Sequence, residues 1–106
     1  MLAQLKRDLR VGDKVQMIKM IHTIDGIPTE VAIRDKVAGI RTITLINTTG
    51  WYFANDEQMK AGNLGSWCEY PKSKDLHYFK EHNVFEIFDK EKNGIIWGVR
   101  TYKIIC

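Results

Sequence analysis

The amino-acid sequence predicts a mainly β domain of the α+β class, folded as a small antiparallel barrel or a curled sheet. Residues 84–105 carry β-branched and aromatic side chains on both sides of Asn93-Gly94, a dipeptide that suits a tight hairpin turn. A second such run, residues 40–47, is followed by a turn at 48–50 and by a partner segment over residues 51–54. Short strands at close intervals with glycines between them are typical of small antiparallel barrels.

Length and composition indicate one domain. The chain has 106 residues, of which 44% are hydrophobic and 27% charged, the balance of an ordinary globular protein. No apolar run approaches the roughly 18 residues of a membrane span. Charges at Lys6, Arg7 and Asp8 stand where a signal peptide would be apolar. We therefore expect a single domain over residues 1–106, cytoplasmic and without a membrane segment.

The first half is expected to hold a short amphipathic turn and four strands. Leu2, Leu5 and Leu9 have helical spacing and predict one amphipathic turn. The cluster at 25–28 predicts a turn, and Gly39 predicts a bulge or a sharp bend. The strands expected around these breaks cover residues 15–22, 30–34, 40–47 and 51–54.

The second half is expected to hold one or two short helices before the terminal hairpin. Asn55 can cap one helical turn, and residues 63–66 are expected to form a loop. Ser73 or Asp75 can cap a short helix near residues 74–82.

The register of the C-terminal β-hairpin has two solutions. A two-residue Asn-Gly turn pairs Phe88 with Val99, whereas a three-residue loop with a bulge pairs Ile87 with Val99. A slip of one residue moves every side chain to the other face of the sheet, and the sequence leaves both registers open.

The segment Val11-Gly12-Asp13-Lys14-Val15, followed by a strand, a long loop and a bent strand leading to Thr49-Gly50-Trp51-Tyr52, resembles the SH3-like small barrels. In that family a Gly-Asp-x-Val step often opens the first strand. The resemblance covers roughly residues 9–54 and implies an SH3-like barrel there, while the residues after Ala54 depart from a minimal barrel. The general character of the chain also resembles accessory proteins of phages and mobile elements.

Residues able to bind a metal or act as nucleophiles are few. Cys68, Cys106, His77 and His82 are four soft ligands, but zinc sites usually pair cysteines two to four residues apart. We expect no metal, no cofactor and two free thiols. A small enzyme using Cys68 with His77 or His82 is an alternative, although no glycine-rich oxyanion turn follows Cys68.

Aromatic residues are the stronger signal. Nine of the eleven gather in residues 51–53, residues 67–70 and the terminal hairpin. On residues 51–53 the side chains of Trp51 and Phe53 share one face, so Tyr52 takes the other, and one of these faces must be core. Aromatic side chains beside lysine or arginine can stack on a partner's groups. The side chains expected to bind a partner are those of Tyr52, Trp67, Tyr70, Arg41, Lys14 and Arg10.

The function expected from these observations is non-enzymatic binding of a macromolecule. A protein partner is favoured, because basic and acidic residues alternate in the last third of the chain. A phage-type inhibitor or an accessory protein of a host complex fits this pattern. The alternative is nucleic-acid binding through a contiguous basic patch, with steep salt dependence, formed by Lys6, Arg7, Arg10, Lys14 and Arg41. A homodimer through the exposed edge of the terminal hairpin is also expected to be feasible.

Overall fold

The computed structural model describes residues 2–33 and 39–105 and contains one eight-stranded antiparallel sheet. The prediction of a mainly β chain is therefore confirmed. Seven strands follow the order β5-β4-β3-β1-β8-β7-β6, and β2 pairs with β1. The strands are β1 (Lys14–Ile24), β2 (Ile27–Glu30), β3 (Arg41–Ile46), β4 (Gly50–Ala54), β5 (Ser66–Glu69), β6 (Leu76–Phe79), β7 (Val84–Lys90) and β8 (Ile96–Ile105). The helical elements are α1 (Leu2–Asp8), α3 (Asp56–Lys60), η1 (Ser73–Asp75) and η2 (Lys80–His82).

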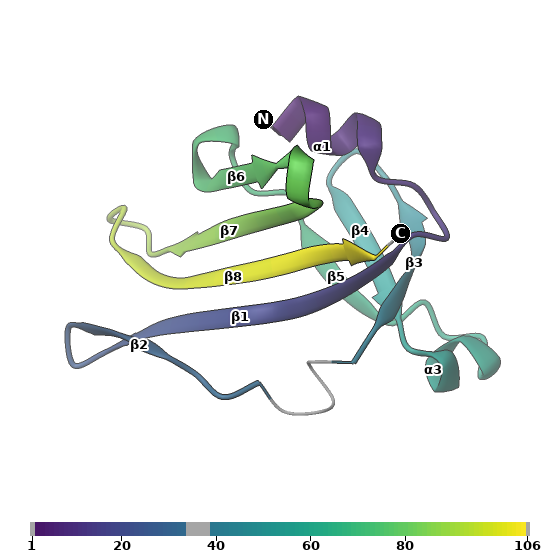
Figure 1. The fold of residues 1–106 in the computed structure, drawn as a ribbon, viewed down its shortest axis with the longest axis horizontal. Coiled ribbons are helices and arrows are strands. Elements are labelled where there is room, and N and C mark those ends of the chain that lie inside the picture. Colours follow the sequence, from purple (N-terminus) through teal and green to yellow (C-terminus); the bar gives the residue numbers. More distant parts are fainter. Residues whose placement is uncertain (1, 34–38, 106) are drawn as a thin grey trace.

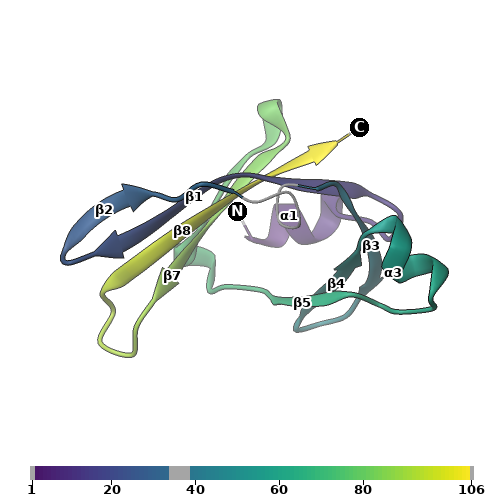
Figure 2. The same cartoon turned by 90° about the horizontal axis from the view of Figure 1, so that it is seen from below.

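The sheet curls into two layers (Figures 1 and 2). Strands β1, β7 and β8 form one layer, and β3, β4 and β5 form the other. Register shifts at Met17/Lys19 in β1 and at Ile43/Leu45 in β3 supply bulges that bend the strands. No pairing between β5 and β6 occurs in the described residues, so the sheet is open there and the curled-sheet alternative describes it. The SH3-like resemblance stays a prediction.

The N-terminal helix forms as its leucine spacing predicts. Leu5 and Leu9 are both buried, and the amide of Leu9 donates to the carbonyl of Leu5 at 2.9 Å. Figure 1 shows α1 lying beside β6 at one margin of the sheet. A helix of this length has little stability of its own, so the burial of its leucines holds it in place.

Strands in the first half lie close to their expected positions, with one correction. β1, β3 and β4 match the runs expected at 15–22, 40–47 and 51–54. The strand expected at 30–34 is wrong, because β2 covers residues 27–30 and pairs with the end of β1 through a tight turn at Asp25-Gly26. Both turn residues have positive φ angles, of 51° and 76°, so the strand starts directly after them. Arg34 lies outside the described residues, and Gly39 forms a bend.

The capped helical turn after β4 is confirmed. The Asn55 side chain accepts from the amide of Gln58 at 2.8 Å, and the Gln58 side chain accepts from the amide of Asn55 at 3.0 Å. This reciprocal pair is a capping box, and it starts α3 at Asp56.

Residues 63–66, expected as a loop, lead into a strand that the sequence did not reveal. Ser66 begins β5, which pairs with β4 through Phe53↔Ser66 and Tyr52↔Trp67. Gly65 precedes it with φ +89°, and a Cβ there would lie 2.1 Å from the carbonyl oxygen of Phe53. The strand thus depends on a glycine that allows its backbone to approach β4.

The helix expected near residues 74–82 is wrong. This segment is the edge strand β6 between the short turns η1 and η2. Leu76 and Tyr78 are buried while His77 and Phe79 are exposed, an alternation with the period of a strand. Pairing of β6 with β7 therefore overrides the helix-capping signals of Ser73 and Asp75.

The terminal hairpin is confirmed, and its register contains both predicted solutions. Most of it follows the register of the two-residue turn, which pairs Phe88 with Val99. Near the turn the amide of Glu91 donates to the carbonyl of Ile95, which encloses a three-residue loop. A bulge between Asp89 and Lys90 shifts the ladder by one residue and connects these two registers.

Both edges of this hairpin are paired within the chain, β8 with β1 and β7 with β6. The paired residues of the hairpin therefore leave no exposed backbone edge of the kind expected for a homodimer. A homodimer through the hairpin stays a prediction, and it would have to use side chains rather than a free backbone edge.

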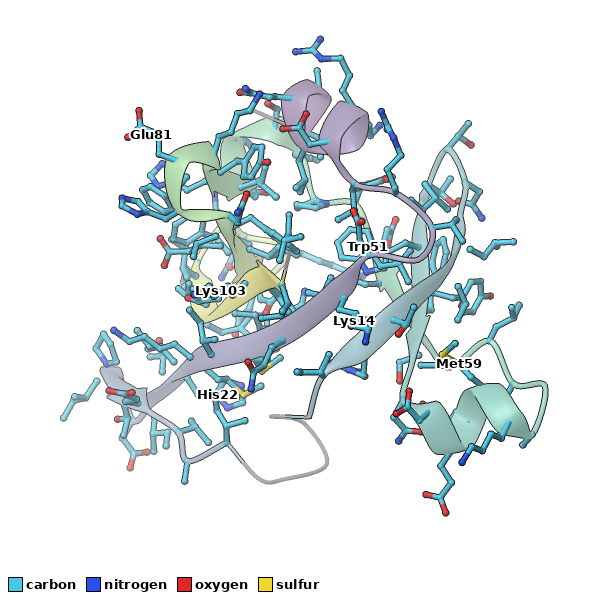
Figure 3. All side chains as sticks on the ribbon, turned by 45° about the vertical axis from the view of Figure 1, so that its right-hand side comes forward. Lys14, His22, Trp51, Met59, Glu81 and Lys103 are labelled. Atoms are coloured by element: carbon cyan, nitrogen blue, oxygen red, sulfur yellow. The ribbon has the colours of Figure 1, made fainter. Side chains whose placement is uncertain are left out.

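The core lies between the two layers. Trp51 is fully buried, and its ring contacts Tyr70, Phe85 and Phe53 at centroid distances of 5.3, 6.0 and 6.2 Å. Figure 3 marks Trp51 in the interior of the molecule. The remaining large, fully buried side chains are Tyr102, Phe85, Leu5, Leu9, Ile43, Leu76, Ile87 and Val15.

The close approach at Gly65 yields a stability prediction. We expect Gly65→Ala to lower the free energy of unfolding by about 2–3 kcal/mol, because the added methyl meets the β4 backbone and the positive φ adds strain. Gly62→Ala is the matched control: its φ is +75°, yet nothing lies within 4 Å of the added Cβ, so about 1 kcal/mol is expected. Urea unfolding measures both. Equal losses would show that the β5 approach does not constrain position 65.

Candidate binding surfaces

Two of the predicted binding residues, Tyr52 and Trp67, form a pair on the outside of the β3-β4-β5 layer. They are direct partners across β4 and β5, and their ring centroids lie 4.8 Å apart at an angle of 51°. Trp67 is 41% exposed and Tyr52 is half-buried. The face of residues 51–53 that forms the core is thus the Trp51/Phe53 face, and Tyr52 points outward.

A glycine makes room for this pair. Gly50 precedes Tyr52 by two residues on the same face, and a Cβ there would lie 2.8 Å from the Trp67 ring. The indole therefore lies across Gly50, next to Tyr52. Leu45, 38% exposed, is the direct partner of Tyr52 on β3. We call the surface made by Leu45, Tyr52 and Trp67 the aromatic face.

The surroundings of the aromatic face are acidic. Residues 42–71 contain three acidic side chains and one basic one, although the whole chain carries a net charge of +3. Asp56 and Glu57 lie in α3, and Glu69 follows Trp67 on β5. None of these three has an ion-pair partner among the described residues. The segment that carries Tyr52 and Trp67 therefore has an excess of negative charge.

A second apolar surface lies at the far end of the molecule, where the turns of two hairpins protrude side by side (Figure 1). Trp97 is 42% exposed, its ring contacts His22 at 5.6 Å, and the Thr23 hydroxyl donates to the Ile96 carbonyl at 3.5 Å. We call this the hairpin-end surface; its exposed apolar side chains are Ile24, Ile27, Ile95, Ile96 and Trp97.

Sequence reasoning did not find the hairpin-end surface. The available signal was the run Ile95-Ile96-Trp97 directly after the turn glycine, where a hairpin rarely buries side chains. Figure 3 shows His22, whose ring contacts Trp97, well apart from Met59 of α3.

Tyr70 and Arg41, also predicted to bind a partner, point away from the aromatic face. Tyr70 packs on Trp51, and the Lys6 ammonium lies 4.7 Å from its ring centroid. The Arg41 guanidinium lies 3.7 Å from the centroid of Phe53, on the inner face of the sheet. Burial lowers the pKa of Arg41, and the nearby Tyr102 and Cys68 oppose that shift. Both residues therefore belong to the border of the core.

Arg100 organises the polar part of this inner face. Its guanidinium donates twice to Asp89, from Nε and Nη2, at 2.8 Å each, and Nη1 lies 3.3 Å from the Tyr102 hydroxyl. Burial works to lower the pKa of Arg100, but the hydrogen bonds to Asp89 and the electrostatic interactions with Tyr102, Cys68 and Asp89 together outweigh it, and the net shift is upward. The pair is a bidentate, partly buried ion pair, which is among the stronger kinds.

Cys68 is a buried thiol in the same region, 3% exposed and 3.9 Å from Arg100 Nη1. Burial raises the pKa of Cys68, while Arg100 opposes the shift. Because a nucleophilic cysteine needs a lowered pKa and access to solvent, this thiol has the properties of a core residue. Cys106 lies outside the described residues.

The histidines of the enzyme hypothesis do not approach Cys68. His77 lies on the outer face of β6, with its ring 5.8 Å from Phe79 and 5.4 Å from Phe88. His82 is exposed in η2. The described part of the chain contains no cluster of three or more side chains that could hold a metal ion. The trio Cys68, His77 and His82 is therefore not assembled into a site.

The basic residues of the nucleic-acid hypothesis do not form one contiguous patch. Arg41 pairs with the buried Val15 and shares its inner face, whereas the neighbouring Lys14 points to the other face. Arg10 lines a cleft of about 510 Å³ between α1 and the end of β8. Arg7 and Lys80 line it as well, but so do Asp8 and Asp13. The predicted basic stripe is thus divided between two faces and a cleft of mixed charge.

None of the described helices is long and apolar enough to cross a membrane. Comparison with protein-family models, with curated proteins and with solved structures finds no match to this chain. Its function must therefore be argued from its own surfaces.

The bidentate pair yields a stability prediction. Asp89→Asn should lower the free energy of unfolding by about 2 kcal/mol, because it leaves the partly buried Arg100 without a countercharge. Lys80→Met is the control: the Lys80 side chain is 60% exposed and 3.7 Å from Asp8, so a change below about 0.5 kcal/mol is expected. Denaturant midpoints report both, and a loss at Asp89 no greater than at Lys80 would refute the prediction.

The upward pKa shift of Cys68 yields a pH prediction. A thiol whose pKa is raised by folding stabilises the protein fully below its unfolded value of 9.0, and this contribution is lost as the pH rises from there toward the folded pKa. We expect the free energy of unfolding to fall between about pH 8 and pH 10, and to fall less steeply in Cys68→Ala.

Burial also raises the pKa of Tyr70 and Tyr102, so a residual slope of the same sign should remain. Measuring both proteins in a Cys106→Ala background leaves one thiol to titrate. Identical slopes with and without Cys68 would contradict the prediction.

Proposed function

We propose that this protein is a non-enzymatic binding module that engages a protein partner through its aromatic face. The observation that carries the proposal is the exposed Tyr52–Trp67 pair, held in one geometry by Gly50 and by the buried neighbours of Tyr52. Tyrosine and tryptophan are enriched among the few residues that supply most of the binding energy at protein interfaces, and side chains fixed before binding lose less entropy on association.

The hairpin-end surface has more exposed apolar side chains, and exposed apolar patches mark interaction sites. It lies, however, on two turns that extend beyond the core, where local opening is easier than in the strands packed on Trp51. Preorganisation therefore favours the aromatic face as the principal contact. A module of this kind acts by occupying a surface of its partner, as a phage-type inhibitor or an accessory protein of a larger complex does.

The test uses two tryptophans of nearly equal exposure, Trp67 at 41% and Trp97 at 42%. The tagged chain and its variants Trp67→Ser and Trp97→Ser are used to capture partners from a lysate of the organism that makes it, with and without nuclease. We expect a protein partner that survives nuclease, is lost with Trp67→Ser and is kept with Trp97→Ser. Affinity for that purified partner should fall by about two orders of magnitude with Trp67→Ser, the loss typical of an aromatic hot spot.

Two other results would overturn the proposal. Loss of the captured partner with Trp97→Ser, but not with Trp67→Ser, would assign the contact to the hairpin-end surface. Loss of the captured partner on treatment with nuclease or modest salt would assign the function to nucleic-acid binding. Circular dichroism of both variants controls for folding, since each replaces an exposed side chain.

A further inference from the structure

The outer edge of β5 offers backbone groups beside the aromatic face, where the Glu69 carbonyl accepts one long contact, from the Cys68 thiol at 3.9 Å. β5 ends the sheet order and, among the described residues, pairs with β4 alone. In Figure 2 it lies at the margin of the layer that it forms with β3 and β4. The free edge of a strand offers a row of donors and acceptors to another strand.

The hydrogen-bond alternation identifies which groups face outward. The amide of Tyr70 donates to the carbonyl of Thr49 at 2.9 Å, one step beyond the Gly50↔Glu69 pair. Gly50 directs its own amide and carbonyl to Asn47, on the side away from β5. Hydrogen-bonded pairs alternate in an antiparallel ladder. The backbone amides and carbonyls of Ser66 and Cys68 therefore face β4, and those of Trp67 and Glu69 point away from the sheet.

The side chains of the same two residues are exposed. Trp67 and Glu69 share the outer face of β5, while Cys68 between them is buried. A strand added at this edge would therefore meet the indole of Trp67 at one position and the carboxylate of Glu69 two residues along. Cross-strand neighbours on one face are the pairs that stabilise a sheet.

Charge selects the sequence of such a strand. The Glu69 side chain is exposed on the outer face of β5. It has no ion-pair partner among the described residues. A lysine or arginine of the incoming strand would compensate this negative charge.

We propose that β5 accepts an extended peptide segment of the protein partner as an additional strand, with an apolar side chain over Trp67 and a lysine or arginine two residues away against Glu69. The proposal rests on the proposed function and specifies the partner's chemistry. A second copy of this chain fits less well, because antiparallel pairing between the outward-facing residues of two β5 edges places Glu69 opposite Trp67 or opposite the other Glu69 and leaves both carboxylates uncompensated. Main-chain bonds would supply affinity, and the two side-chain positions would supply specificity.

The experiment selects ligands from a displayed library of extended ten-residue peptides, using the full chain and its variant Glu69→Lys. The expected ligands of the native chain have an apolar residue two positions from a lysine or arginine, and those of Glu69→Lys have an acidic residue at the basic position. In the complex, amide exchange measured by NMR should slow at Trp67 and Glu69. N-methylation of peptide amides that face β5 should weaken binding about tenfold for each bond lost, whereas methylation of the alternate amides should leave affinity within about twofold.

The failures are distinguishable. Peptides that bind with no charge preference and no protection of the Trp67 and Glu69 amides would overturn strand addition, and so would a selection that yields no peptide. If the affinity of the purified partner still depended on Trp67, the proposed function would stand without it. Peptides that protect the amides of the hairpin-end surface would assign peptide binding to that surface and overturn the proposal. Sedimentation showing a dimer that Glu69→Lys dissociates would assign the β5 edge to a second copy of this chain and overturn it as well.

Discussion

The fold depends on the burial of Trp51. This side chain projects from β4 in one layer and meets Phe85 of β7 in the other, while Phe85 stacks on Tyr102 at 5.2 Å and Tyr102 contacts Phe53 at 6.1 Å. The four rings form a closed circuit across the space between the layers. Large aromatic side chains dominate the free energy of a small core, so this circuit sets how closely the layers approach.

The same burial determines the outer surface. With Trp51 and Phe53 facing inward, the side chain between them must face outward, and the register of β5 then places Trp67 beside it. A slip of one residue in β4 would bury Tyr52 and expose two large rings, which makes the register well specified. The aromatic face is therefore a consequence of the core.

The sequence predicted the elements whose signals are local. Asn55 and Gln58 carry a capping box within four residues, and Asn93-Gly94 marks its turn directly. The segment 74–82 carried local helix signals too, but pairing with β7 outweighed them. β5 was missed because its strand character comes from contact with β4. For the same reason Tyr52 and Trp67 could be named separately but not as a pair, and Tyr70 and Arg41 could not be assigned to the border of the core.

The position of β8 bears on the order in which the chain can fold. β8 lies between β1 and β7, so the strand nearest the C-terminus of the described chain is the one that joins the N-terminal strand to the rest of its layer. The β1–β8 ladder runs from Lys14↔Ile105 to His22↔Gly98, and closing so long a loop costs entropy before any contact repays it. A chain still lacking β8 holds two groups of strands with unpaired edges. Assembly of the sheet is thus a late, non-local event, and a chain ended before Ile96 loses the link between its two ends.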